Sequence, residues 1–189
     1  MQFTEIFIIF VMSIVLLIYI QSYYGEIDII KSNLDDRKYV VQQYSDKDKA
    51  ADLLASINQD VLKLIQHMRA KYPDREDVAY MAKHYNPNAL SEGNLDSGYT
   101  SYSINKGEKV VLCIRQKDKS FVQKNILMYV VIHELAHIMT HDEIGHTTKF
   151  WTNFKLLLEE AISIGLYVKQ DFDKKHEDYC GIKITSSVI

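Results

Sequence analysis

Val131-Ile132-His133-Glu134-Leu135-Ala136-His137 carries more structural information than any other part of this 189-residue chain. Apolar residues flank it and predict a largely buried helix over about 121–140. His133 and His137 are four residues apart, so their imidazoles project from one helix face and can share an ion. Zinc suits them because it accepts neutral imidazole nitrogens at ~2.0–2.1 Å in tetrahedral geometry. Glu134 is turned ~100° from His133, where a general base for a metal-bound water belongs.

A catalytic zinc site needs a third protein ligand and an open position. Four of the seven histidines lie between positions 133 and 146. We favour His146, because the preceding residues can reverse the chain with Gly145 as the pivot. His141 ranks second, since the helix rise places it ~12 Å from the first histidine. Glu159 or Glu160, on the following predicted helix, ranks third.

These residues resemble the WLM/SprT-like, or Wss1-type, zincin metallopeptidases. That family typically shows HELxH, a short loop, and then a histidine followed four residues later by Phe and often Trp; residues 145–151, Gly-His-Thr-Thr-Lys-Phe-Trp, match this ending. The resemblance implies His133, His137 and His146 as zinc ligands and Glu134 as the catalytic acid/base. It covers roughly residues 76–165 and is specific only over 131–151.

Two departures from the family pattern limit what the resemblance implies. The loop between the second and third histidines is longer than in the Wss1-type pattern. No basic DNA-binding tail or ubiquitin-like partner motif is visible, so the family's role in repair of DNA–protein crosslinks is not carried over.

Composition describes an ordinary globular chain, with 47% hydrophobic and 25% charged residues. The net charge of -3 and the absence of a basic stripe argue against a nucleic-acid partner. The two cysteines do not form a metal-binding spacing. We interpret Cys113 as a small buried apolar residue of a strand. A Cys113–Cys180 disulfide is the alternative if the domain faces an oxidising compartment.

The N-terminus, residues 1–25, is expected to be a transmembrane anchor. No charged residue occurs from Ile6 to Tyr24, a helical length of ~28 Å. A cleaved signal peptide is the weaker alternative, because the start lacks basic residues and a small-residue cleavage site. Lys31, Arg37 and Lys38 follow the helix and place the remaining chain on the cytoplasmic side by the positive-inside rule.

The predicted fold class is α+β and zincin-like, with a small antiparallel sheet packed on the active-site helix and a following helix, after the N-terminal transmembrane helix. We expect a linker or stalk over 26–45, a metallopeptidase domain over 46–172 and a C-terminal tail over 173–189. The domain's predicted elements are helices at about 46–72, 76–84, 121–140 and 148–164, a loop at 91–98 and a hairpin of 99–104 with 109–115. Gly165 is expected to end the last helix. The tail is expected to hold one short strand over 179–185.

The predicted function is a membrane-anchored zinc metallopeptidase that hydrolyses peptide bonds by Glu-assisted attack of a zinc-bound water. The expected partners are a protein or peptide substrate and the membrane, and the substrate is expected to pair along strand 109–115. Tyr102 or Tyr179 is a candidate oxyanion stabiliser. One alternative is a structural zinc site, closed for instance by His141. The other is a DNA-associated protease, which requires a strongly basic surface.

Overall fold

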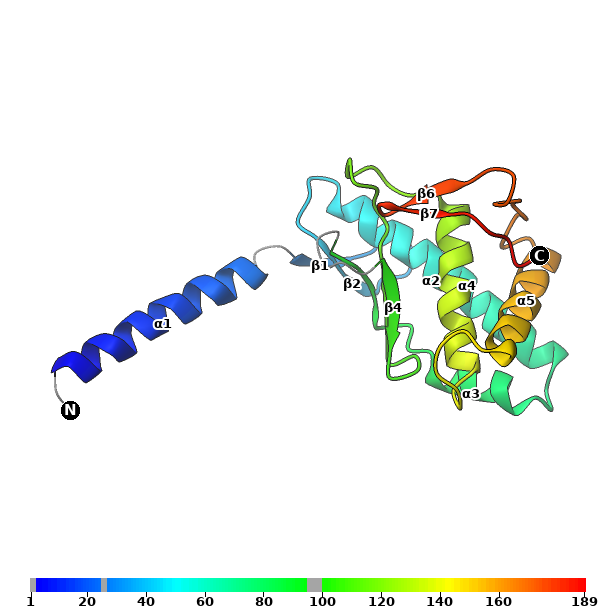
Figure 1. The fold of residues 1–189 in the computed structure, drawn as a ribbon, viewed down its shortest axis with the longest axis horizontal. Helices are drawn as coiled ribbons and strands as arrows, with labels where there is room; N and C mark the ends of the chain where they lie inside the picture. Colours follow the sequence, from blue (N-terminus) through cyan, green and yellow to red (C-terminus); the bar gives the residue numbers. More distant parts are fainter. Residues whose placement is uncertain (1–2, 25–26, 95–99) are drawn as a thin grey trace.

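The computed structural model describes residues 3–24, 27–94 and 100–189, and within them the chain is an α+β fold with five helices and three small sheets (Figure 1). The helices are α1 (Phe3–Tyr24), α2 (Lys47–Lys71), α3 (Glu76–His84), α4 (Lys124–Met139) and α5 (Thr148–Ser163). The strands are β1 (Ile27–Lys31), β2 (Lys38–Gln42), β3 (Leu90–Glu92), β4 (Ser101–Ile104), β5 (Lys109–Leu112), β6 (Glu177–Tyr179) and β7 (Ile182–Ile184). The predicted helices at 46–72, 76–84, 121–140 and 148–164 all form, with ends shifted by a few residues.

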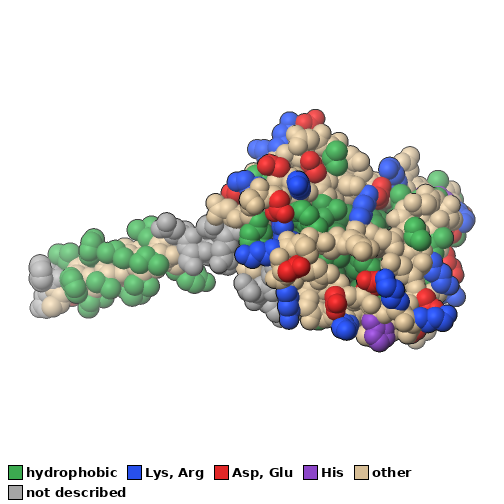
Figure 2. Space-filling model, turned by 90° about the horizontal axis from the view of Figure 1, so that it is seen from above, with side chains coloured by type: hydrophobic (Ala, Val, Ile, Leu, Met, Phe, Trp, Pro, Cys, Tyr) green, Lys and Arg blue, Asp and Glu red, His purple; other side chains and the backbone are tan. Residues whose placement is uncertain are grey.

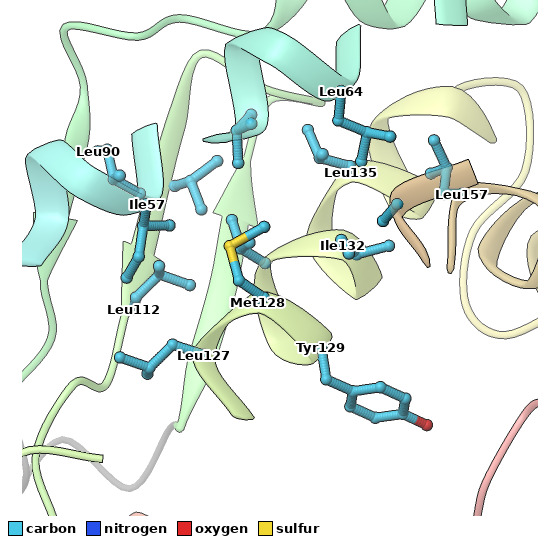
Figure 3. Packing of buried hydrophobic residues seen from close by; sticks show 14 of the residues in the cluster. Ile57, Leu64, Leu90, Leu112, Leu127, Met128, Tyr129, Ile132, Leu135 and Leu157 are labelled. Carbon is cyan, nitrogen blue, oxygen red and sulfur yellow. The ribbon is translucent and has the colours of Figure 1, made fainter. Parts of the chain in front are cut away.

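Helix α4, which carries the HExxH residues, lies at the centre of the domain. It packs against α2, α3 and α5 and against strands β4 and β5. Ile132 and Leu135 are fully buried and lie close to Leu157 of α5 and Leu64 of α2 (Figure 3). A helix that is apolar on almost every side is stable only when it is surrounded in this way. Its position fixes the backbone from which the site residues project.

The three-stranded sheet has the order β3-β5-β4 and is mixed, not antiparallel as predicted. Strand β4 pairs antiparallel with β5 through the predicted hairpin, whereas β3 pairs parallel with β5. The turn residues Asn105, Lys106 and Gly107 have positive φ angles, as a tight hairpin connection requires. Strand β3 falls at the start of the expected 91–98 loop, of which residues 95–98 lie outside the described residues. Its three residues are too few to show a period.

This strand order corrects the prediction of where a substrate strand would pair. The prediction used strand 109–115, which contains β5. Both edges of β5 are already occupied, by β3 and by β4. In the described part of the chain, β4 is the strand of this sheet that lies beside α4 and pairs with no other strand on its outer edge.

Two further hairpins form in the segments that were expected to be a linker and a C-terminal tail. Strands β1 and β2 pair antiparallel and pack against α2, so residues 27–42 are not the predicted linker or stalk. Tyr39 and Val41 of β2 are almost fully buried in the main core. In the predicted tail, β6 and β7 form a hairpin where one strand was expected. The strands of both hairpins are only three to five residues long and mix charged with apolar residues, so they show no clear strand period.

Helix α1 forms where the transmembrane anchor was predicted, and its apolar side chains are exposed (Figure 2). Among the residues that the structure describes, no helix is both long and apolar enough to cross a membrane. The predicted transmembrane span is therefore not supported.

Cys113 and Cys180 form a disulfide, which corrects the interpretation of Cys113 as an unpaired residue. Cys113 is buried, as predicted, just after β5, and Cys180 lies in the turn between β6 and β7. The sequence separation of 67 residues explains why spacing alone did not favour the pair. The pair is the one that was predicted from the sequence as the alternative.

Candidate metal centre

The structure brings together the three imidazoles that were predicted to bind zinc. One nitrogen from each of His133, His137 and His146 lies within 4.8 Å of the corresponding nitrogens of the other two. The Nε2 atoms of His133 and His146 are 3.1 Å apart. A tetrahedral zinc with Zn–N bonds of 2.0–2.1 Å holds its ligand nitrogens roughly 3.3 Å apart. The donor set and its spacing therefore fit a zinc ion after small ring movements.

The loop after α4 returns His146 to the two helical histidines. The helix ends at Met139, and Gly145 has a φ of +82°, the left-handed conformation expected of the pivot. The Lys106 ammonium, from the β4–β5 turn, donates to the Glu143 carbonyl at 2.7 Å and holds the loop. Thr147 then caps α5, its side chain accepting from a backbone N–H. His146 is thus fixed between a held loop and a capped helix.

Phe150 forms the apolar floor of the centre. Its ring centroid lies 4.9, 4.4 and 4.7 Å from those of His133, His137 and His146. The side chain is fully buried. Phe150 is in the first turn of α5, which begins two residues after His146. This helix turn therefore covers the side of the imidazoles that faces the core. This is the physical role of the phenylalanine four residues after the third histidine.

Burial keeps the helical histidines in the form that a metal needs. Desolvation lowers the pKa of His133 to about 3, and the neighbouring imidazoles lower it further in the same direction. Desolvation likewise lowers the pKa of His137 to about 4, together with the charges of His146 and Lys106. Both rings are therefore neutral at physiological pH, with a nitrogen lone pair free to bind a cation.

Glu134 lies beside the imidazoles with 5% of its surface exposed. Burial raises the pKa of its carboxyl to about 7, against the opposing effect of hydrogen bonds with the hydroxyl and backbone of Ser103 in β4. In the described part of the chain, Glu134 forms no ion pair with Lys, Arg or His. A carboxyl whose pKa is near 7 can both accept and return a proton at neutral pH.

An open cleft of about 720 Å³ runs over these residues. Strand β4 and its turn form one wall, and the loop residues Ile144 to His146 form another. His133, Glu134 and His137 line the cleft between them. The centre is therefore accessible from outside and is not sealed in the core.

The other candidate ligands lie elsewhere. His141 stacks on Tyr80 with ring centroids 3.7 Å apart and is not part of the histidine cluster. Glu159 is exposed beside Lys155, and Glu160 binds Lys71 from α2. The prediction that ranked His146 first agrees with this geometry, although its role as a ligand stays a prediction.

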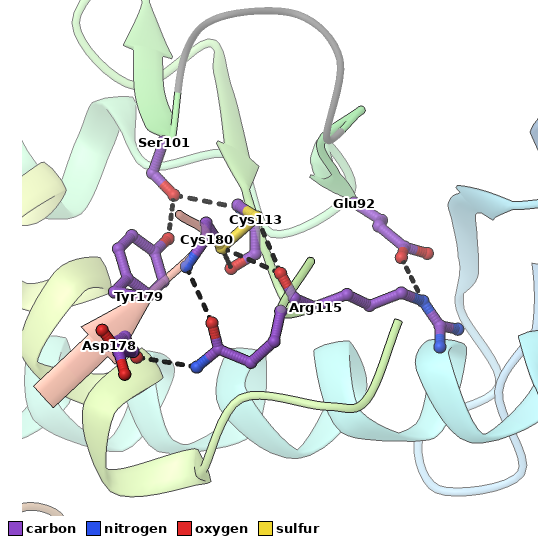
Figure 4. The surroundings of a disulfide bond; sticks show 8 residues. Glu92, Ser101, Cys113, Arg115, Asp178, Tyr179 and Cys180 are labelled. Carbon is purple, nitrogen blue, oxygen red and sulfur yellow. Dashed lines mark hydrogen bonds and ion pairs between the residues drawn. A yellow bond between two sulfur atoms is a disulfide. The ribbon is translucent and has the colours of Figure 1, made fainter. Parts of the chain in front are cut away.

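The sequence did not predict three residues that support the site. Ser103 hydrogen-bonds Glu134, Lys106 holds the loop before His146, and Ser101 pairs with the Tyr179 hydroxyl. Ser103 and Lys106 lie in a hairpin some 30 residues before the motif, and nothing in their spacing links them to it. Tyr179, a candidate oxyanion stabiliser, is hydrogen-bonded to the Ser101 hydroxyl at 2.5 Å (Figure 4). Tyr102, the other candidate, lines the cleft.

Comparison with known proteins places the chain in a family. A family model described as the WLM domain matches residues 34–188. The chain belongs to the WLM domain family. The match begins before residue 46 and continues past residue 172, so it includes β2 and the β6–β7 hairpin.

Two viral relatives are similar to the chain in sequence. Uncharacterized protein R325 of Acanthamoeba polyphaga mimivirus is 28% identical over 170 residues, which cover 87% of this chain and 86% of the relative. Uncharacterized protein 136R of Invertebrate iridescent virus 6 is 44% identical over 85 residues, which cover 43% of this chain and 47% of the relative. The second match thus spans about half of that protein.

The fold is similar to that of Wss1 from Saccharomyces cerevisiae. The crystal structure aligns with a TM-score of 0.51 at 20% identity, covering 66% of this chain and 86% of Wss1. At that identity the likeness concerns the fold alone. Together with the family match, it gives the chain a fold of the zinc metalloprotease type.

Proposed function

We propose that this WLM domain protein is a zinc-dependent metallopeptidase that hydrolyses peptide bonds. The observation that carries the proposal is the convergence of three imidazoles beside Glu134, a buried carboxyl that pairs with no cationic side chain among the described residues. His133, His137 and His146 would hold the ion, which leaves one position of a tetrahedral shell for water or substrate. A structural zinc site has no need of such an acid beside an open cleft.

Zinc, when bound, supplies Lewis-acid polarisation of a carbonyl and lowers the pKa of water. Glu134 receives the proton of the attacking water and delivers it to the departing amine. Ser103 hydrogen-bonds the same carboxyl and holds it toward the cleft. Phe150 excludes water from beneath the imidazoles. Each of these tasks belongs to a side chain that the fold holds in place.

Strand β4 offers a way to align the substrate. Its residues Ser101 to Ser103 line the cleft, and in the described residues its far edge pairs with no other strand. An extended peptide that adds to this edge places its backbone over the imidazoles. We therefore propose an extended protein or peptide segment as the substrate.

The alternatives draw less support. His141 is stacked on Tyr80, so it does not complete a four-ligand shell. On the face shown in Figure 2, Lys and Arg side chains are interspersed with Asp and Glu and form no basic patch. A DNA-associated protease is expected to present a strongly basic surface. We therefore do not include a nucleic acid among the proposed partners.

The test is metal analysis and a casein or peptide cleavage assay on the full chain, comparing wild type with Glu134→Gln. We expect zinc in both proteins and activity in the wild type alone. Glu159→Gln, an equally conservative change at an exposed glutamate, is the matched control and should remain active. Equal activity in wild type and Glu134→Gln refutes the mechanism. Bound zinc without activity in any of the three proteins favours the structural alternative.

A further inference from the structure

A second, smaller cavity of about 250 Å³ adjoins the cleft on the side of Glu134. The two cavities share Thr100, Ser101, His133 and Glu134 as lining residues, so each borders the same side of the centre. The rest of the small cavity is lined by Tyr129, Val130, Tyr179, Ile182 and Ile184. Those five are aliphatic or aromatic, in contrast to the mixed lining of the cleft.

The polar atoms of the two tyrosines are already bonded, so they do not make the cavity polar. The Tyr179 hydroxyl pairs with the Ser101 hydroxyl, and the Tyr129 hydroxyl donates to the Ser186 carbonyl at 3.4 Å. Away from the border that it shares with the cleft, the cavity offers a ligand the two tyrosine rings and the three aliphatic side chains. Such a surface favours an apolar group, because a charged group loses its hydration there without gaining a partner.

One wall of the cavity is the β6–β7 hairpin, which lies beside the N-terminal half of α4 (Figure 1). Cys180 in its turn is bonded to Cys113 (Figure 4). The Gln116 side chain donates to the Asp178 carbonyl at 2.7 Å and accepts from the Cys180 N–H at 3.1 Å. The hairpin is thus tied to the central sheet by one covalent bond and several hydrogen bonds, and its position beside Glu134 is fixed.

We propose that this cavity is the substrate-selecting pocket of the enzyme and that it takes one apolar side chain of the peptide, next to the bond that is cleaved. The inference rests on the proposed function. Three observations support it: the cavity shares residues with the cleft, its remaining lining is apolar, and its wall is fixed. Its volume is below the roughly 300–1,000 Å³ of small-molecule sites, which suits a single side chain.

The occupant is a residue of the substrate and not a separate ligand, because Glu134 and His133 border both cavities. A peptide that extends along β4 passes this border as it crosses the centre. A side chain projecting from it toward α4 meets Val130 and Tyr129, one turn before His133. The C-terminal hairpin therefore determines which peptides fit.

The kinetic test uses full-length protein and peptides of fixed sequence in which one position carries Leu, Ala, Asp or Lys. We expect wild type to cleave beside Leu with kcat/KM roughly tenfold or more above that for Ala, the scale of a few buried carbons. Ile182→Phe, at a half-exposed position, fills the cavity and should lower the Leu/Ala ratio about tenfold. Val168→Phe, on an exposed side chain outside the cavity, should keep the wild-type ratio. A Lys or Asp preference, or an unchanged ratio in Ile182→Phe, overturns the pocket.

A binding measurement separates failure of the pocket from failure of the proposed function. The single tryptophan, Trp151, lies with its ring 5.5 Å from that of His146, so its fluorescence reports on the site. In Glu134→Gln, a Gly/Ser peptide carrying one Leu should bind roughly tenfold tighter than the same peptide carrying Ala, and Ile182→Phe should abolish the difference. Equal binding of the two peptides overturns the pocket even when no peptide is cleaved. Loss of cleavage with retained Leu preference overturns the proposed function alone.

Discussion

Two buried glutamates lie beside histidines in this protein, and they differ in the side chains that surround their carboxyl groups. Glu134 on α4 lies next to His133, and Glu160 on α5 is 2.6 Å from His67 of α2. Each residue exposes 5% of its surface. A simple count of His and Glu near one another would rank the two clusters alike. What separates them is whether a cation accompanies the acid.

Glu160 is fully partnered. Its oxygens accept hydrogen bonds from Lys71 at 2.7 Å and from the Tyr72 hydroxyl at 2.7 Å, in addition to its contact with His67. Burial by itself raises the pKa of this carboxyl, but these hydrogen bonds outweigh it and lower the pKa to about 2. Glu160 is therefore a permanent anion that ties α5 to α2.

Glu134 exposes the same small fraction of its surface, but no cationic side chain of the described residues pairs with it, and burial raises its pKa to about 7. Keeping an acid buried and unpaired costs stability, so the cost points to a use. The comparison teaches that the fold holds one glutamate as structure and keeps the other available for proton transfer. The predictions below test that division.

The largest effect is expected from Glu134→Gln. Because a positioned acid–base group typically contributes about 10²–10⁴-fold to rate, kcat for peptide cleavage should fall by about that factor. The free energy of unfolding should stay the same or rise, since the substitution removes a buried unpaired acid. Urea unfolding and cleavage kinetics on the same preparations test both parts. A large loss of stability in Glu134→Gln would mean that this acid is structural after all.

The next largest effect concerns metal affinity. His146→Ala removes one of three converging nitrogens, and zinc affinity should fall by at least about 100-fold, since loss of an outer-shell partner already costs up to that much. His67→Ala removes the histidine of the other cluster and should leave zinc affinity unchanged. Competition with a chelator of known affinity measures both. Equal zinc affinity in the two variants would place the ion elsewhere.

A smaller effect, on stability, is expected from Glu160→Gln. Hydrogen bonds to an anion from Lys71, Tyr72 and His67 are weakened or lost, and the free energy of unfolding should fall by about 2–3 kcal/mol. The kcat of the folded variant should match that of wild type. If activity disappears while the fold persists, the structural assignment of Glu160 is wrong.

The sequence was most informative where the determining interactions are local. The HExxH spacing, the pivot at Gly145 and the cap at Gly165 depend on neighbouring residues, and the structure shows the expected helix, reversal and positive φ. His146 was ranked above His141 because Gly145 can reverse the chain and because the helix rise places His141 ~12 Å from His133. The hairpin turn at 105–107 was predictable as well, because the turn is determined by its own residues.

Long-range pairings were not predictable from one sequence. The partners of Glu160 lie 88 to 93 residues away, and Cys113 pairs across 67 residues. Strand β3 joins β5 in parallel through a register that three residues do not specify. Consequently Glu160 was considered as a metal ligand, because only the fold reveals the cations around it.

The smallest prediction is a pH dependence that separates the two glutamates without any assay of activity. The pKa of Glu160 is lowered from its usual 4.5 to about 2, so the folded state binds its proton less readily than the unfolded state does. The stabilisation is therefore complete above about pH 5 and is lost as the pH falls toward 2. Between pH 7 and pH 4 the loss is about 1 kcal/mol.

Other carboxylates titrate in this range as well, so the useful quantity is a difference between proteins. The stability gap between wild type and Glu160→Gln, measured by urea unfolding, should narrow by about 1 kcal/mol from pH 7 to pH 4. A gap that is constant down to pH 4 would show that the Lys71 and His67 contacts do not favour the anion. In that case the contrast between a permanently charged glutamate and an available one would no longer distinguish the two clusters.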